Sequence, residues 1–230
     1  MIKVHHLEQS RSHRVLWMLE ELGLDYELVC YKRDPDTWLA PTALRQVHPL
    51  GKSPVLQDGD LVLAESGAVL DYLADRYDGQ RLLSPEPMPA QAPERVRYRY
   101  WLHYAEGSAM PPLLMALVFG RVRSAPMPFF AKPIAKGIVD KVMKTFIGPQ
   151  LRLHLGWMER ELGEYPWFAG ERFSAADIQM SFPVQAAAAR AANMADYPKL
   201  QGFLRRIGER PAYQRAEARG GVLTMVGGKQ

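Results

Sequence analysis

The stretch HHLEQSRSHRVLWMLEELG, residues 5–23, passes from an apolar start into a regular helical pattern. The residues MIKVHHL predict a strand, and SHRVLWMLEELG predicts a helix that Gly23 closes. Between them, residues 8–13 form a short polar run with two serines, two arginines and no cysteine. Ser10 and Ser12 therefore either cap the helix or face a ligand, and the rest of the chain has to decide.

The next segments extend this strand–helix start into a small domain. YELVCYK predicts a second strand, apolar on both faces and therefore buried, with Cys30 as a core residue. PVLQ and LVLA flank Asp58-Gly59-Asp60, which indicates a hairpin, and SGAVLDYLADRYD predicts a helix. This order favours a small mixed sheet with helices on its faces, over residues 1–83.

A proline-rich linker at 84–93 separates this α/β domain from the remainder of the chain. From 94 to 230 the sequence shows long helical periodicities and no strand alternation. We therefore expect an α+β protein in which an all-helical domain follows the sheet domain.

Composition excludes several classes of protein. The chain has 230 residues, 47% of them hydrophobic, and a net charge of +4 without a basic-aromatic nucleic-acid motif. It shows no signal peptide and no run of about 18 apolar residues, so we expect a cytoplasmic protein with no nucleic-acid or membrane partner. The one cysteine precludes an internal disulfide, and His5 and His6 lack metal-site spacing, so no metal is expected.

Two further stretches carry polar residues where a ligand could bind. In GKSPVL, residues 51–56, Pro54 opens a strand, which is common at sheet edges; a cis Ser53–Pro54 bond would turn the Ser53 backbone outward. In AESGAVLDYL, Glu65 and Ser66 stand where a strand meets a helix. Ser66 could be an ordinary cap, or the helix N-terminus could bind a carboxylate while Glu65 pairs with an ammonium group.

Together, SRSHRVLWMLEELGLDYEL, HPLGKSPVL and ESGAVLDYL resemble the glutathione transferase superfamily, in a serine-type bacterial and fungal branch. The resemblance covers the whole chain and implies a thioredoxin-like N-terminal domain and an all-α C-terminal domain. In WFAGERFSAADIQM, Ser174 and Asp177 resemble the family's capping box, a structural feature.

The resemblance assigns roles to the polar residues of the first domain. Ser10 with Arg14 fits the family's S-x-x-x-R spacing, so Ser10 is the expected donor to the glutathione thiolate. Ser12 is the second choice, with capping its more natural role, and a backbone or water group is the third. Glutathione would be held by residues of the other two stretches, Lys52, Ser53, Pro54, Glu65 and Ser66.

The expected activity is conjugation of glutathione to a small hydrophobic electrophile by a homodimer, with glutathione as co-substrate and no permanently bound cofactor. A glutathione-dependent peroxidase at the same site, or a non-catalytic glutathione-binding protein, would share these motifs. The electrophile pocket is expected on the first helix of the second domain, although such a stripe also suits a core: Tyr100, Trp101, Tyr104 and Met110.

Overall fold

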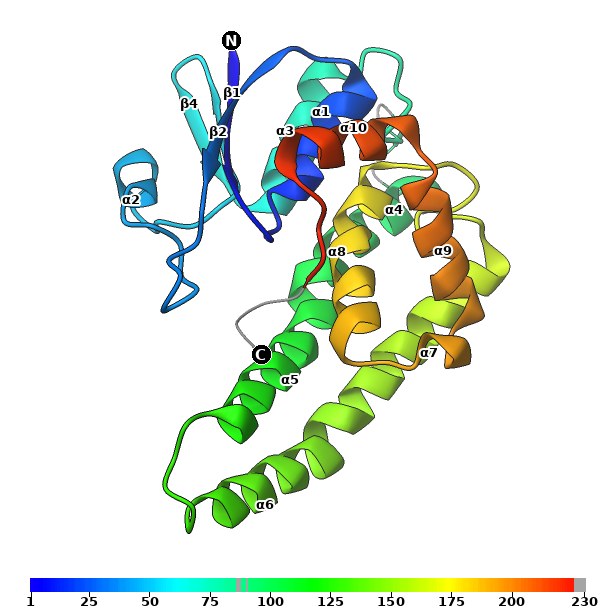
Figure 1. The fold of residues 1–230 in the computed structure, drawn as a ribbon. Coiled ribbons are helices and arrows are strands. Elements are labelled where there is room, and N and C mark those ends of the chain that lie inside the picture. The colour runs from blue at the N-terminus through cyan, green and yellow to red at the C-terminus, as the bar shows by residue number, and fades with distance from the viewer. Residues whose placement is uncertain (86–87, 90, 226–230) are drawn as a thin grey trace.

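The computed structural model describes residues 1–85, 88–89 and 91–225, so part of the expected linker and the last five residues lie outside the described chain. The first half contains β1 (Ile2–Leu7), α1 (His13–Leu22), β2 (Tyr26–Tyr31), α2 (Leu44–Val47), β3 (Val55–Asp58), β4 (Leu61–Ala64) and α3 (Ser66–Tyr77). The expected alternation of strands and helices is therefore present in this half (Figure 1).

The strands form one mixed sheet in the order β2-β1-β3-β4. β1 pairs parallel with β2 and antiparallel with β3, so Val4 lies between Leu28 and Leu56. β3 and β4 form the expected hairpin, in which Gly59 takes the positive φ of 59° that the turn requires. The central β1 thus carries the polar loop that leads into α1.

The prediction that β2 is buried on both faces is wrong, and so is the placement of Cys30 in the core. β2 lies at the edge of the sheet, where Glu27 and Cys30 are exposed. An apolar run is compatible with a central or an edge strand, and only the order of strands in space decides between them.

The second half contains helices joined by loops, and in its described residues the β pairing is limited to one isolated bridge between Trp167 and Gly170. It contains α4 (Pro93–Tyr104), α5 (Met110–Ser124), α6 (Lys132–Val142), α7 (Gly148–Glu164), α8 (Ala175–Arg190), α9 (Pro198–Gly208) and α10 (Pro211–Gly220), with π-helical turns η1 (Ala105–Ala109) and η2 (Met143–Ile147) and a 3₁₀ turn η3 (Met194–Asp196). Each π-helical turn ends two residues before a proline, Pro111 after η1 and Pro149 after η2, where an α-helical hydrogen bond would lack its donor. The elements follow one another without a gap, so α4–η1–α5 and α6–η2–α7 form two long, roughly antiparallel helical rods (Figure 1).

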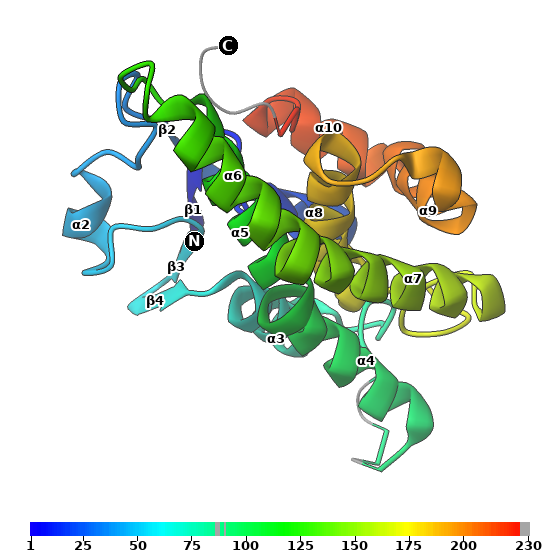
Figure 2. The same cartoon turned by 90° about the horizontal axis from the view of Figure 1, so that it is seen from below.

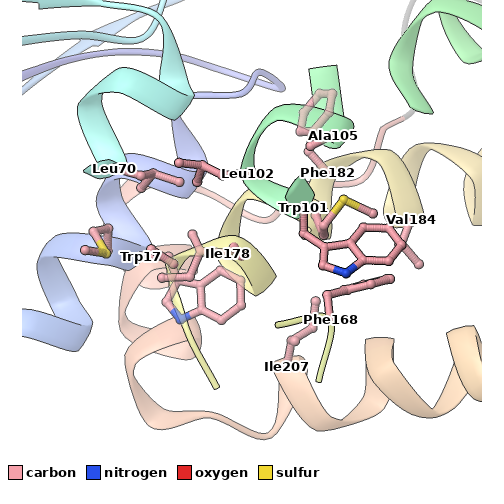
Figure 3. Close-up of a cluster of buried hydrophobic side chains, with 14 of the residues drawn as sticks. Trp17, Leu70, Trp101, Leu102, Ala105, Phe168, Ile178, Phe182, Val184 and Ile207 are labelled. Atoms are coloured by element: carbon pink, nitrogen blue, oxygen red, sulfur yellow. The ribbon is translucent and has the colours of Figure 1, made fainter. Parts of the chain in front are cut away.

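One hydrophobic core joins the two halves. Trp17 and Leu70 come from α1 and α3, and they pack in the same buried cluster as Trp101 and Ile178 of the helical half (Figure 3). The C-terminal α10 also packs along α1 (Figure 1), so the helical half reaches back to the polar loop of the first.

The capping box expected at the start of α8 is present. Asp177 is fully buried and accepts hydrogen bonds from the backbone N–H groups of Ser174 (2.9 Å) and Phe168 (2.8 Å). This carboxylate therefore fixes both the helix start and the preceding turn.

Replacing Asp177 by alanine is expected to lower the free energy of unfolding by about 2–3 kcal/mol, because two buried N–H groups lose their acceptor. Urea unfolding measures the change. Asp196→Ala, at an exposed position in η3, is the control and should change stability by less than about 0.5 kcal/mol. Equal losses in the two variants would contradict the structural role of the box.

Candidate functional site

A chain of three hydrogen-bonded side chains connects the polar loop to β1. Ser10 Oγ lies 2.7 Å from Ser12 Oγ, which lies 2.8 Å from Nδ1 of His6. His6 Nε2 lies 2.9 Å from the carbonyl oxygen of Gly220, at the end of α10. Ser12 is fully buried and Ser10 nearly so, with 6% of its surface exposed, so Ser10 is the outermost member of the chain.

The direction of the protons follows from the two ends of this chain. The Gly220 carbonyl can only accept, so His6 Nε2 carries a proton. Burial lowers the pKa of His6 below its ordinary value, although the hydrogen bond to Gly220 acts in the opposite direction. His6 is therefore neutral at neutral pH, with Nδ1 as an acceptor. Ser12 then donates to His6, and Ser10 donates to Ser12 while accepting from the Ser12 N–H at 3.2 Å.

The capping role expected for Ser12 is wrong. Ser12 occupies the N-cap position of α1, yet its hydroxyl makes no capping hydrogen bond. The hydroxyl instead points back to β1, where it accepts from the backbone N–H of Leu7 at 3.2 Å and meets His6. The N-cap residue takes a helical conformation, with φ −65° and ψ −19°, in place of the extended one that aims a side chain at the first turn.

Ser53 ties the second polar stretch to the same end of β1. The Ser53–Pro54 peptide bond is cis. Ser53 Oγ donates to the carbonyl of His5 at 2.8 Å and accepts from the N–H of Leu7 at 3.2 Å. Next to it, Lys52 is exposed and borders a hollow of about 580 Å³ that Lys32, Arg33 and Arg45 also line, with Asp34 as a lining acid. The hollow is therefore suited to an anionic group.

The third stretch meets α1 through a buried arginine. Arg14 Nη1 donates to Ser66 Oγ at 3.0 Å, and Gln179 Nε2 donates to the same oxygen at 3.3 Å. Both lone pairs of Ser66 are thus used, which leaves its own proton for an acceptor outside this set. The hydrogen bonds of Ser66 Oγ thus go to side chains and not to the backbone N–H groups of the first turn, so the ordinary cap is wrong, and the carboxylate site stays a prediction.

Glu65 has an unusual backbone conformation. Its φ is 70°, although a non-glycine residue at positive φ costs about 1–3 kcal/mol. Its side chain is exposed, while its carbonyl accepts the first helical hydrogen bond from Val69. Strain of this kind concentrates at ligand-binding positions, because the surrounding structure has to hold it in place.

Two residues of the helical half complete the cluster, and neither was expected from the sequence. Glu106 accepts from Arg14 Nη1 at 2.8 Å and from Arg11 Nε at 2.9 Å, and Gln179 Oε1 accepts from Arg14 at 2.9 Å. Burial favours the neutral acid, but Arg14 and Arg11 hold the pKa of Glu106 below its ordinary value. A glutamate in the otherwise uncharged AEGSAM segment, and a glutamine within the buried helix ADIQMS, were the available signals.

The four residues named for the electrophile pocket are mostly buried. Trp101, Tyr104 and Met110 are buried, and Trp101 packs against Phe168 with ring centroids 4.8 Å apart (Figure 3). Tyr100 is 45% exposed and borders, with Trp101, a cavity of about 1000 Å³ between α4, α7 and the linker. The residues that line this cavity include none of the polar residues around Ser10.

The fold defines a two-domain protein in which an all-helical domain follows a thioredoxin-like domain with a four-stranded sheet. Residues 10–76 match the model of the glutathione S-transferase N-terminal domain, and residues 147–211 match that of the C-terminal domain. Glutathione S-transferase 1 of Saccharomyces cerevisiae is 34% identical, over 97% of this chain and 97% of its own length. The chain therefore belongs to the glutathione S-transferase family and is an enzyme of that family, whose co-substrate is glutathione.

Two other proteins similar to this chain carry different functional names. The crystal structure of a glutathione S-transferase from Actinobacillus pleuropneumoniae superposes with a TM-score of 0.81 at 38% identity, covering 98% of this chain and 95% of that one. The disulfide-bond oxidoreductase YfcG of Escherichia coli is 27% identical over 92% of both chains. Relatives of this fold are thus named for two kinds of chemistry.

Proposed function

We propose that this enzyme conjugates the glutathione thiolate to small hydrophobic electrophiles, with Ser10 as the residue that stabilises the thiolate. The observation that carries the proposal is the position of Ser10, the outermost hydroxyl of a buried hydrogen-bonded chain directly before α1. The first turn of α1 adds its positive dipole end on the same side of the loop.

The required stabilisation is within reach of such a hydroxyl. A free thiol with a pKa of about 8.5 is only about 3% ionised at pH 7. Lowering that pKa by about two units takes roughly 2.7 kcal/mol, and hydrogen bonds to a charged group contribute about 1.5–3 kcal/mol each. Ser10 has to turn its proton from Ser12 toward the sulfur, and it keeps the hydrogen bond from the Ser12 N–H when it does so. The thiolate then forms a carbon–sulfur bond to the electrophile. An aryl halide loses its halide ion, whereas an enal or an epoxide keeps all its atoms and takes up a proton from water.

The two ends of glutathione find matching groups on either side of Ser10. Lys52 and the cationic hollow beside it are suited to the glycine carboxylate. Ser66, with its proton available, is suited to the γ-glutamyl carboxylate at the start of α3, and Glu65 to the ammonium group. Ser53 and Pro54 fix the loop that would face the cysteinyl backbone.

A direct test combines glutathione binding by calorimetry with thioether formation from glutathione and an aryl halide. We expect binding with release of a proton from the thiol, followed by thioether formation. The conjugation proposal would be contradicted if glutathione bound but no thioether formed with any member of a panel of aryl halides, enals and epoxides.

Glutathione-dependent disulfide reduction is the second candidate, because the relative from Escherichia coli carries that name. It would use the same thiolate, which attacks a sulfur atom in place of a carbon atom. Reduction of a mixed disulfide and of an organic peroxide, each coupled to glutathione reductase, separates this chemistry and the peroxidase alternative from conjugation. Turnover of only these substrates would replace the first proposal by the second.

Ser12→Ala should affect stability more than catalysis. The change removes the acceptor of Ser10's proton and leaves Nδ1 of His6 without its donor, so we expect a loss of about 1–2 kcal/mol in the free energy of unfolding. The pKa of bound glutathione should stay low or fall further, because Ser10 is then free to donate to sulfur. A raised thiol pKa in this variant would instead make Ser12 the group that acts on the thiolate.

A further inference from the structure

The rods α4–η1–α5 and α6–η2–α7 extend beyond the rest of the molecule as a helical hairpin. The hairpin, defined here as Met110–Ile147, comprises α5, the connecting loop, α6 and η2. Its loop end lies far from the sheet and from α8–α10 in Figure 1, and Figure 2 shows α6 lying across the underside of the molecule. α5 and α6 pack on each other along this projecting part, so much of their surface faces solvent.

The surface of the hairpin is unusually apolar. At its tip, Phe129 and Phe130 are 84% and 64% exposed and contact each other edge to face. Six further large apolar side chains along its helices are exposed to at least 44%: Leu114, Val118, Val122, Ile134, Ile138 and Phe146. Leu114, Val118 and Val122 follow one another at intervals of four on α5, as do Ile134 and Ile138 on α6, so each set lies on one face of its helix. A large exposed apolar surface marks an interaction site, whereas scattered single residues do not.

The same hairpin carries the positive charge of the chain. It contains six lysines and arginines and one acid, Asp140, which pairs with Arg123 across the two helices. Its net charge of +5 exceeds the +4 of the whole protein, so the remaining residues together are slightly negative. Four of the cations stand within eight residues of a phenylalanine along the chain, at 121 and 123 near the end of α5 and at 132 and 136 in α6.

We propose that the hairpin is a membrane-surface contact that binds bilayers containing anionic lipids. Phe129 and Phe130 enter the boundary between headgroups and acyl chains, and the surrounding cations meet the lipid phosphates and carboxylates. The phenylalanines lie in the loop at the tip and the cations lie in the adjoining helices. This order matches that of a bilayer surface, in which the apolar acyl chains lie beneath the anionic headgroups. The expectation of no membrane partner rests on the lack of a spanning segment, and a surface contact needs none. No helix in the described part of the chain is long and apolar enough to cross a bilayer.

The hairpin of a second copy fits this surface less well. Two hairpins that met about a twofold axis would bring together two surfaces of charge +5. A nucleic acid would match the charge and could stack its bases on the phenylalanines, but it offers nothing to the exposed aliphatic side chains along α5 and α6. An anionic bilayer matches both the charge and the aliphatic side chains.

Flotation with lipid vesicles tests the proposal on the full chain. We expect the protein to float with vesicles of phosphatidylcholine and phosphatidylserine, to stay behind with phosphatidylcholine alone, and to be released by added salt. Phe129→Ala with Phe130→Ala should lower the partition coefficient at least about tenfold, because two large apolar groups lose their buried site. Lys132→Gln with Lys136→Gln should also weaken binding to the anionic vesicles, and the binding that remains should depend less on salt.

Matched pairs elsewhere serve as controls. Leu82→Ala with Val96→Ala changes two side chains that are 55% and 52% exposed near the linker, and Lys199→Gln with Arg205→Gln removes two charges from α9. Both pairs should leave partitioning unchanged, and glutathione turnover in solution should be unchanged in every variant. The proposal is overturned if the wild type does not float, or if the hairpin variants float as well as it does. It is also overturned if the phenylalanine variant only changes the molar mass measured by light scattering, because the hairpin is then an interface between copies.

Discussion

Replacing Ser10 by alanine is expected to lower kcat/KM for conjugation by about a hundredfold. Two units of thiol pKa correspond to roughly 2.7 kcal/mol, and the loss of one preorganised donor to a developing anion costs an amount of this order. The absorbance of the thiolate in the glutathione complex, followed over pH, should show its titration shifted upward by about two units. Folding should be little affected, because Ser10 is the outermost of the three hydrogen-bonded side chains. Ser12, its partner, still has its hydrogen bonds to His6 and to the Leu7 N–H in this variant.

The control for this variant is Ser181→Ala, which removes another buried serine hydroxyl, one that donates to the Ile178 carbonyl within α8. Its kcat/KM and thiol pKa should match those of the wild type. An unchanged thiol pKa in Ser10→Ala would remove Ser10 from the proposed mechanism. Comparison with Ser12→Ala would then decide between the second serine and a backbone N–H group.

The pH profile carries a further signature of the hydrogen-bonded chain. When His6 is protonated, its Nδ1 donates to Ser12, Ser12 can donate to Ser10, and Ser10 can give its proton to sulfur. Because burial lowers the pKa of His6, this arrangement is present only below the ordinary histidine range and is lost as pH rises. We therefore expect the thiolate absorbance of the wild type to depart from the titration curve of a single group at acid pH. The absorbance of His6→Gln should follow a single-group curve.

Local signals explain how much of the fold the sequence could predict. Gly23 ends α1 in the left-handed conformation, Asp58-Gly59-Asp60 forms the hairpin turn, and Ser174 with Asp177 starts α8. Each of these signals acts over a few neighbouring residues, so one sequence suffices to identify it. The edge position of β2 and the exposure of Cys30 depend on strand order, which no local signal specifies.

The candidate site is harder to predict because its contacts join distant parts of the chain. His6 reaches Gly220 across 214 residues, and Arg14 reaches Gln179 across 165. From the sequence, Ser12 has only a helix start beside it, so capping is the natural interpretation. Similarly, a helical stripe such as Tyr100 to Met110 identifies an apolar face without saying whether that face meets the core or a cleft, and here most of it meets the core.

The ion pair between Arg14 and Glu106 gives the second large expected effect. Arg14 is 1% exposed, and its Nε and Nη2 have no hydrogen-bond partner among the described residues. Burial lowers the pKa of Arg14 to about 10, opposed by Glu106, so the guanidinium stays charged at neutral pH. Glu106 is thus the anion that compensates a buried cation. The Arg14 Cζ atom also lies 5.0 Å from the centroid of the Phe182 ring.

Glu106→Ala should therefore lower the free energy of unfolding by about 3 kcal/mol, at the low end of the range for a broken buried pair because the Glu106 side chain is 32% exposed. Glu27→Ala, which breaks the exposed pair with Lys3, is the matched control and should cost less than about 1 kcal/mol. Urea unfolding measures both.

The double variant separates charge compensation from packing. With Arg14→Met added to Glu106→Ala, no uncompensated cation is left inside the protein, so the double variant should be more stable than Glu106→Ala alone. Losses that simply add would show that the two residues act independently. Glutathione affinity should still fall in the double variant, because Ser66 loses the donor that holds its hydroxyl toward the proposed carboxylate site. Stability that recovers while affinity does not would thus assign the pair two roles, one in the joint between the domains and one in shaping the site.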